Sequence, residues 1–287
     1  MASGTPRKLK ATDASKTYRY LRIGMLLAVV LLGASIAIER AKVDCWQTSI
    51  SAYYYTPVRA IFVGGMIAVG FSLIVIKGRT QWEDIALNVA GMLAPVVAVA
   101  PTTDVGACWS VQPSPLPVMN GSPAHWVVTN VDNNFEALLI TGALGLGIAA
   151  VLAIVLNRGP RAAVARVRTG TVLSLAVTTL ALVVGWWLLK SWDAFYTRAH
   201  GLAAVLMFVF LIGAVVSKAL EHREESTTYF PIYSAVGLLM AIGGIVIAWL
   251  RIGNDHTVLI LEAYEIVLFA VFWLVQTVEN WDEQVTT

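Results

Sequence analysis

Charged residues are scarce in this sequence. Of 287 residues, only 13% are charged, whereas 57% are hydrophobic. A soluble domain carries about 25% charged residues, because they cover its surface. The composition therefore excludes an ordinary soluble protein and predicts a membrane protein. A formal net charge of +2 also lacks the strong basic excess of nucleic-acid-binding proteins, so we expect no nucleic acid partner.

Motifs of catalysis and cofactor binding are missing as well. The sequence has no Walker-type phosphate loop, no GxSxG elbow and no CxxCH haem motif. We therefore expect no cofactor, and a non-enzymatic protein is the favoured interpretation. Two cysteines, Cys45 and Cys108, are too few for a disulfide-dense secreted module.

Long apolar runs dominate what is present. A bilayer is crossed by about 20 apolar residues in a helix, and the sequence offers eight such runs. They are Leu21 to Ile38, Ala60 to Ile76, Ile85 to Ala100, Ala137 to Leu156, Thr171 to Leu189, Gly201 to Leu220, Ile232 to Leu250 and Val258 to Val278. The sequence predicts an all-α, polytopic transmembrane bundle of about eight helices.

Basic residues predict the orientation of this bundle. Fourteen of the twenty Lys and Arg residues fall on the side that holds both termini. Cytoplasmic segments are enriched in Lys and Arg, so both termini are predicted to be cytoplasmic in a plasma membrane. Residues 1–20 and 279–287 form tails in this scheme, and residues 21–278 form the bundle, with ordered outer loops at 39–59 and 101–136. Cys45 and Cys108 then share the outer side, where they form a disulfide or remain two thiols.

Two acids lie inside the last predicted span. Glu262 and Glu265 are three residues apart, and the same helix face continues through Phe269, Phe272, Gln276 and Glu279. Ionisable groups are costly in lipid, so this face must contact protein or a water-filled cavity. Glu262 and Glu265 are candidate ligand-binding or proton-binding groups. The alternative is an ion pair with Arg59, Arg198 or Arg251, which are predicted at the same level.

A hydroxyl-rich stretch precedes the second span. Ser51, Tyr54 and their neighbours lead through Pro57 into Arg59. Serines and threonines cap exposed amides at helix starts, and tyrosines suit the membrane interface. The alternative is the wall of a polar pocket, in which Arg59 meets a lipid phosphate or a glutamate.

Histidines and a short acidic segment are weaker signals. His200 is a candidate ligand-binding residue, and His200 and His256 could contribute to an outer zinc site. No two histidines have the spacing of a metal-binding motif such as HxxxH, so no metal site is predicted. Glu221, Glu224 and Glu225, around His222 and Arg223, indicate a solvated cytoplasmic loop or a docking site for a partner.

Four strings carry a resemblance to a group of known proteins. They are SISAYYYTPVRAIFVGG, NVAGMLAPVVAVAPT, AHGLAAVLMF and LEAYEIVLFAVFWLVQTVENW. The sequence resembles uncharacterised multi-pass membrane proteins of actinobacteria, near the DRAM/Sfk-type membrane families. The resemblance implies a plasma-membrane helical bundle and assigns no catalytic residue. Ceramidase-like membrane hydrolases were also considered, but the sequence lacks their HxxxH.

Three functional hypotheses follow. The first is a non-enzymatic membrane protein with a polar outer-leaflet cavity, which binds membrane lipid or serves as an accessory subunit beside other membrane proteins. The second is a small-solute or proton-coupled transporter that uses Glu265. The third is a metal-dependent hydrolase at the outer face.

Overall fold

The computed structural model describes residues 5–106, 108, 118–119, 122–156, 161–192, 194–224 and 228–281. Within these ranges, the side chains of residues 5–15, 118–119, 153–156, 161–171 and 174 lie outside the description. Residues 109–117, within the outer loop predicted at 101–136, are likewise not described.

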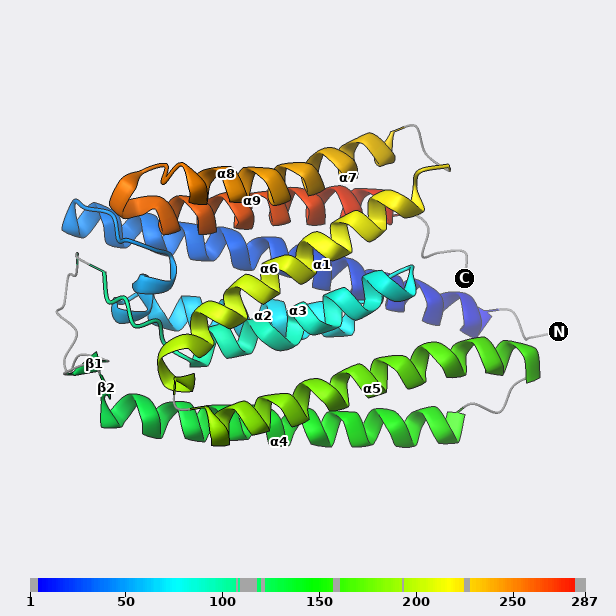
Figure 1. Cartoon of the computed structure of the whole chain (residues 1–287). Helices are drawn as coiled ribbons and strands as arrows, with labels where there is room; N and C mark the ends of the chain where they lie inside the picture. Colours follow the sequence, from blue (N-terminus) through cyan, green and yellow to red (C-terminus); the bar gives the residue numbers. More distant parts are fainter. Residues whose placement is uncertain are drawn as a thin grey trace.

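The described chain runs up and down through eight helical rods (Figure 1). They are α1 (Thr5–Val43), α2 (Arg59–Val75), α3 (Gln81–Val99), α4 (His125–Leu156), α5 (Arg161–Ser191), α6 (Phe195–Glu221), a rod of α7 (Tyr229–Leu238), the π-helical turn η2 (Leu239–Gly243) and α8 (Gly244–Trp249), and α9 (Thr257–Glu279). Short 3₁₀ helices, η1 (Ser51–Tyr55) and η3 (Asn254–His256), and the paired strands β1 (Val118–Met119) and β2 (Ser122–Pro123) lie in the connections. The prediction of an all-α bundle of about eight helices is confirmed.

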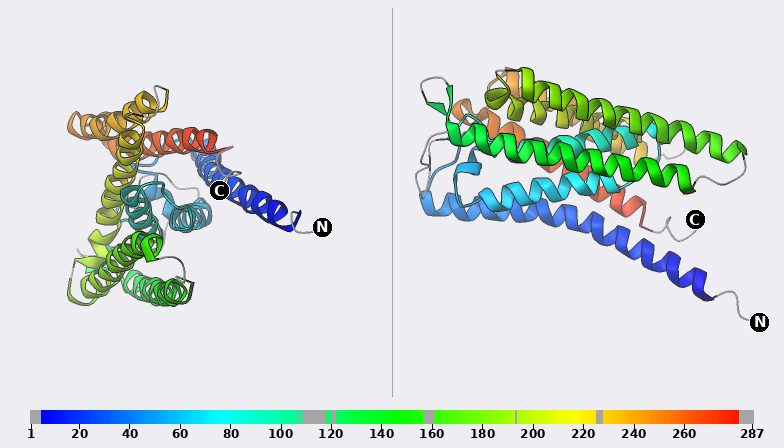
Figure 2. Two further views of the ribbon diagram at one scale, coloured as in Figure 1. Left: turned by 90° about the vertical axis from the view of Figure 1, so that its right-hand side faces the viewer. Right: turned by 90° about the horizontal axis from the view of Figure 1, so that it is seen from below.

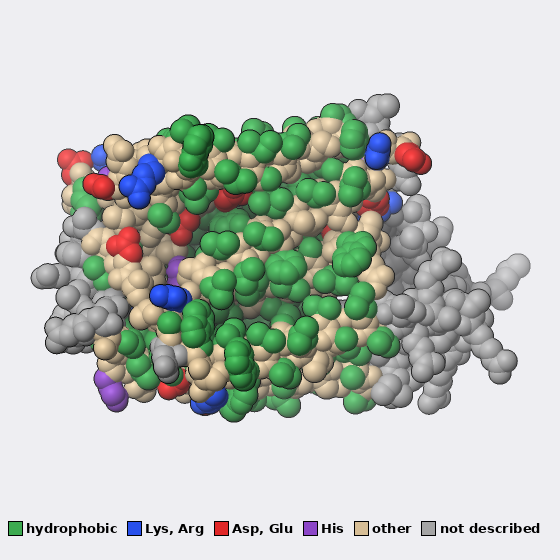
Figure 3. Space-filling model, viewed as in Figure 1, with side chains coloured by type: hydrophobic (Ala, Val, Ile, Leu, Met, Phe, Trp, Pro, Cys, Tyr) green, Lys and Arg blue, Asp and Glu red, His purple; other side chains and the backbone are tan. Residues whose placement is uncertain are grey.

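Six of the helices are long and apolar enough to cross a membrane. These segments are Lys16–Val43, Gln81–Val99, His125–Leu152, Phe195–Glu221, Tyr229–Trp249 and Asn254–Glu279. Two shorter apolar helical stretches, Arg59–Val75 and Leu175–Ser191, complete the predicted set. Large hydrophobic side chains cover the outer faces of the bundle (Figure 3). The architecture is consistent with a multi-pass membrane protein.

The bundle has two distinct ends. At the end that we call the terminal end, the Arg19 guanidinium donates a hydrogen bond to the Trp281 carbonyl and lies 4.7 Å from the Trp281 ring centroid. The part of α1 around Arg19 therefore meets the segment that follows α9. The opposite end, which we call the disulfide end, holds Cys45 and Cys108. Which side of the membrane each end faces stays a prediction.

The helix α3 occupies the centre of the arrangement. Its most extensive contacts are with α6 and then with α2. Figure 2 shows, along the bundle axis, α2 and α3 in the middle, the α4–α5 hairpin on one side and the α7–α8 rod with α9 on another. The helix α6 runs diagonally between these groups, so α3 and α6 connect the outer parts of the fold.

The helix α4 begins earlier than the apolar run predicted. It starts at His125, within the loop predicted at 101–136. Val127, Val131 and Phe135 recur at helical spacing and are buried against Leu189, at the end of α5, and the start of α6. Packing against protein, rather than contact with lipid, extends this helix.

Glycines allow α2 and α3 to approach closely. A Cβ atom at Gly70 would lie 2.7 Å from the Gly91 carbonyl oxygen, and one at Gly91 would lie 2.6 Å from the Gly70 carbonyl oxygen. The backbone of each helix thus occupies the space that a side chain at the glycine of the other helix would need, as in close helix pairs within membranes. By contrast, a Cβ at Gly64 on α2 would meet nothing within 4 Å.

We predict that Gly70→Ala destabilises the bundle by about 1–3 kcal/mol, because the new methyl group forces two backbones apart. The matched control Gly64→Ala should be neutral or slightly stabilising, since alanine favours helix and the site is open. Thermal unfolding of the detergent-solubilised variants measures both effects. Equal melting temperatures for the two variants would contradict the close α2–α3 contact.

Candidate functional site

Polar side chains gather at both ends of α9, with aromatic side chains between them. Glu265, Phe269, Phe272 and Gln276 are all buried, and the Glu279 side chain is only 4% exposed. The prediction that this face of the helix contacts protein is therefore confirmed. The two polar regions have different chemistry and are described in turn.

A disulfide joins the two loops at the disulfide end. Cys45 and Cys108 are bonded, with their Cα atoms 6.2 Å apart. Of the two predicted alternatives, a disulfide or two thiols, the structure has the disulfide. The Gln47 side chain donates to the Cys108 carbonyl and accepts from the Cys108 amide. The Thr48 hydroxyl also lies 2.6 Å from Asp104. These contacts hold the first loop against the segment that follows α3.

Glu262 is bound by the start of the 3₁₀ helix η1 rather than by an arginine. Its Oε2 accepts from the amides of Ile50 at 2.6 Å and Ser51 at 3.3 Å, and its Oε1 accepts from the Ser51 hydroxyl at 2.8 Å. The expected ion pair with Arg59, Arg198 or Arg251 is thus wrong. Amides at a helical N-terminus are unpaired and carry partial positive charge, so they satisfy a carboxylate without a cation.

The hydroxyl-rich stretch forms its own caps. The Ser49 hydroxyl accepts from the Ala52 amide at 2.9 Å, and the Thr56 hydroxyl accepts from the Val58 amide at 3.2 Å. These hydroxyls bond amides near the two helix starts, although the N-cap residues themselves, Ile50 and Val58, have no side-chain cap. Arg59 donates to the Tyr54 hydroxyl at 2.7 Å and lies over the Tyr54 ring, so it meets neither glutamate. Ser51 and Tyr54 are buried, and their proposed roles in ligand binding stay predictions.

The two candidate histidines are held separately. The Nδ1 of His200 donates to the carbonyls of Val97 at 3.0 Å and Ala100 at 2.7 Å, whereas the His256 ring lies 3.3 Å from the Trp46 carbonyl. Among the described residues, no group of three or more His, Cys, Asp or Glu side chains could hold a metal ion. Both histidines stabilise loops and helix ends by bonding backbone oxygens.

A cavity formed by the described residues at this end is apolar, unlike the polar cavity that was predicted. A groove of about 550 Å³ runs between α1 and α9. Its lining comprises Val29, Leu32, Gly33, Ile36, Ala37, Trp46, Ile50, His256, Leu259, Ile260, Ala263, Ile266 and Val267. The polar groups of η1 bind one another and Glu262 instead of facing this space.

An aromatic layer closes the middle of the bundle. Phe269 and Trp273 stack with centroids 5.8 Å apart, and Phe272 makes an edge contact with Tyr233 at 5.7 Å. Phe272, Trp273 and Tyr233 are at most 1% exposed. This layer separates the disulfide end of α9 from the charged groups at its other end.

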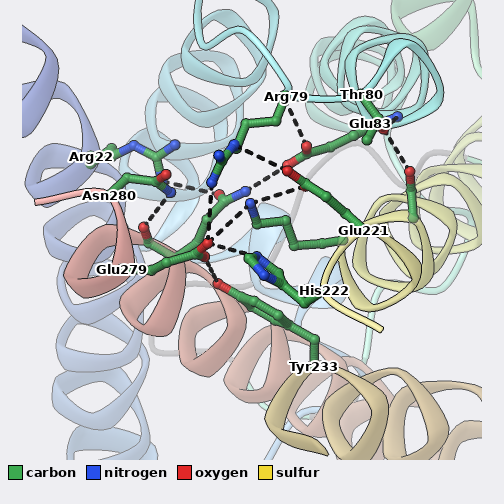
Figure 4. A network of polar contacts seen from close by, with 12 residues as sticks. Arg22, Arg79, Thr80, Glu83, Glu221, His222, Tyr233, Glu279 and Asn280 are labelled. Carbon is green, nitrogen blue, oxygen red and sulfur yellow. Dashed lines mark hydrogen bonds and ion pairs between the residues drawn. The ribbon is translucent and has the colours of Figure 1, made fainter. Parts of the chain in front are cut away.

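A buried ionic network lies at the terminal end (Figure 4). Its centre is Glu279, whose Oε1 lies 2.7 Å from His222 Nε2, 3.3 Å from Lys218 Nζ and 3.6 Å from Arg79 Nη1. The Tyr233 hydroxyl donates to the other carboxylate oxygen. A single carboxylate thus joins the ends of α6, α7 and α9 to the segment that precedes α3.

A second chain of contacts extends this network to α1. Arg22 donates to the Gln276 side-chain oxygen at 3.0 Å, and Gln276 donates to Glu83 at 2.6 Å. The Arg79 amide donates to the other oxygen of Glu83 at 2.8 Å, and the Arg79 guanidinium pairs with Glu221 at 3.0 Å. Together with Lys218 and Glu279, the network contains three cationic side chains and three acidic ones, so their formal charges balance. They are Arg22, Arg79 and Lys218, and Glu83, Glu221 and Glu279.

The network corrects the interpretation of the acidic segment as a solvated loop at Glu221 and His222, while Arg223 remains exposed as predicted. Glu221 is the last residue of α6 and pairs with Lys218 at 3.2 Å, while His222 is buried on Glu279. Glu224 is exposed, and Glu225 lies outside the described residues. Residues near a helix end were expected to face water, but here other helix ends cover them.

Comparisons of this chain with protein-family models, with curated proteins and with solved structures found no match. The resemblance to actinobacterial membrane proteins therefore stays a prediction. Function has to be inferred from the chemistry of the groove, of Glu265 and of the network.

We predict that Glu279→Gln costs about 3–5 kcal/mol of stability, because it leaves the fully buried Lys218 and its neighbours without their central acid. The control is Glu136→Gln, which removes an exposed partner of Lys190 and should cost about 0–1 kcal/mol. Unfolding in mixed micelles with increasing SDS compares the two. A loss for Glu279→Gln no larger than that of the control would contradict a structural role for the network.

Proposed function

We propose that this chain is an integral membrane protein that binds a membrane lipid in the groove between α1 and α9. The supporting observation is the apolar lining of that groove, to which α1, the disulfide-linked first loop and α9 all contribute. The basic residues at the terminal end support a cytoplasmic location for both termini.

The size and chemistry of the groove favour an acyl chain. A volume of about 550 Å³ lies within the roughly 300–1,000 Å³ range of small-molecule pockets. A transmembrane helix of 20 residues, about 10 Å across and 30 Å long, occupies more than about 2,000 Å³. The groove therefore suits one chain of a lipid, whereas a helix of another subunit would place only part of its surface there.

Charges near the groove suit a lipid phosphate. The last turn of α1 carries Arg40 and Lys42. The Arg40 guanidinium lies 5.7 Å from the centroid of Trp46, whose ring lines the groove and is 46% exposed. Tryptophan favours the membrane interface, and arginine binds phosphate through charge-assisted hydrogen bonds. An anionic headgroup at Arg40 would place its acyl chain in the groove.

Gly33 provides a direct test. It lines the groove, and a Cβ atom there would meet nothing within 4 Å, so a larger side chain would occupy lipid space without a clash. We predict that Gly33→Leu lowers retained lipid by about tenfold, equivalent to about 1.4 kcal/mol of binding. Native mass spectrometry of the protein released from lipid nanodiscs measures the bound lipid.

The control for this test is Gly24→Leu. Gly24 lies on the same helix and is equally open, but it does not line the groove. Lipid retention that falls equally in both variants, or in neither, would contradict the proposal. Recovery of a second membrane protein in place of lipid, lost in Gly33→Leu, would favour the accessory-subunit hypothesis instead.

A further inference from the structure

Glu265 is a buried acid with an unsatisfied oxygen. Glu265 is only 4% exposed, and its Oε2 atom has no hydrogen-bond partner. An ionised carboxylate that is buried without a partner is costly, and within a membrane such residues mark functional sites by default. Glu262, one turn away, has three donors. This contrast distinguishes Glu265 from Glu262.

The side chain of Glu265 is held against backbone rather than against a cation. A Cβ atom at Gly244, the first residue of α8, would lie 2.6 Å from the Glu265 Oε1. The π-helical turn η2 precedes this glycine, and the Tyr264 hydroxyl donates to the carbonyl of Leu239 in that turn at 2.8 Å. Single π-helical turns inside α-helices are frequent at functional sites.

Several titratable groups that neighbouring elements carry at this end bond partners other than Glu265, while Arg198 and Arg251 are exposed. On α9, Glu262 binds η1 and Tyr264 binds η2. On α6, His200 bonds two carbonyls of the α3 end, and on α2, Arg59 bonds Tyr54. On α1, Glu39 is another buried acid and supplies no positive charge. Within the described part of the chain, these groups leave Glu265 without a counter-charge.

Glu265 is also separate from the two regions already described. The groove is lined by Ala263, Ile266 and Val267 on another side of α9. Toward the terminal end, Phe269 and Trp273 lie between Glu265 and the Glu279 network. Figure 3 shows a hollow between α6 and the α7–α8 rod, with acidic side chains visible in it.

We propose that Glu265 is a proton-binding site within the apolar part of the bundle. A proton suits the site better than a metal ion, because Ca²⁺ or Mg²⁺ takes about six or more oxygen ligands. A proton needs only the unsatisfied oxygen. Binding it removes the uncompensated charge and leaves a neutral carboxyl packed on Gly244. This proposal goes beyond lipid binding and does not depend on it.

A hydrophobic carbodiimide tests the proposal in the wild-type protein, because it modifies protonated carboxyls in apolar surroundings. The protein in nanodiscs is treated with dicyclohexylcarbodiimide over a range of pH values, and the adduct is located by peptide mass spectrometry. We expect an adduct at Glu265, with labelling that falls about tenfold for each pH unit once the carboxyl ionises. Glu262, which is bound by three donors, should stay unmodified.

Two variants serve as controls for this labelling. Glu265→Gln should abolish the adduct, whereas Glu136→Gln, at an exposed site, should leave it unchanged. No adduct at Glu265, labelling of Glu262 and Glu265 alike, or labelling that does not change with pH would each overturn the proposal. The decisive measurement uses the unmutated chain. The test therefore remains valid even if Glu265→Gln folds poorly.

Discussion

The buried carboxylate of Glu279 is the interaction on which the rest of this bundle depends. It receives Arg79, Lys218, His222 and Tyr233 from three different parts of the chain. A buried carboxylate requires such partners, since breaking one buried pair leaves an uncompensated charge. Each partner fixes one helix end relative to α9. The positions of α6, α7 and α9 along the rest of the bundle follow from this shared attachment.

The different faces of α9 explain how one helix serves several purposes. Its face toward α1 forms a wall of the apolar groove. Its buried stripe carries Glu265 next to α8, then the aromatic layer, then Gln276 and Glu279. The groove suits an acyl chain, because it has volume and no charge. The site at Glu265 suits a proton, because it has charge and little room. In the network, by contrast, the central carboxylate of Glu279 is paired with cations, and we interpret the network as structural.

The sequence predicted the helices and the buried face of α9 because both depend on local periodicity. Apolar runs of membrane-spanning length and acids at helical spacing are visible without any partner. The partners were not predictable in the same way. Glu262 binds the amides of Ile50 and Ser51, and backbone donors leave no signature in the sequence. The alternative of an arginine partner rested on charge alone, which ignores how well unpaired amides satisfy a carboxylate.

The terminal network shows the same limit. Arg22, Arg79 and Lys218 were interpreted only as basic residues that mark the cytoplasmic side, because Lys and Arg near helix ends usually reach water. In the structure, other helix ends cover them, and Lys218 is fully buried. Gln276 and Glu279 lay on the helix face that was predicted to be buried, so the part of the network on α9 could be recognised from the sequence. The other half required knowing that α6 crosses α3 and ends beside α9.

The groove between α1 and α9 carries the central functional claim, and a structure in lipid tests it most directly. Crystals grown from a lipidic mesophase would show what occupies this space. We predict an elongated density along Leu32, Ile36 and Ile266, with its polar end near Arg40. A groove closed by the side chains of α1 and α9, or filled by a helix of another chain, would contradict lipid binding.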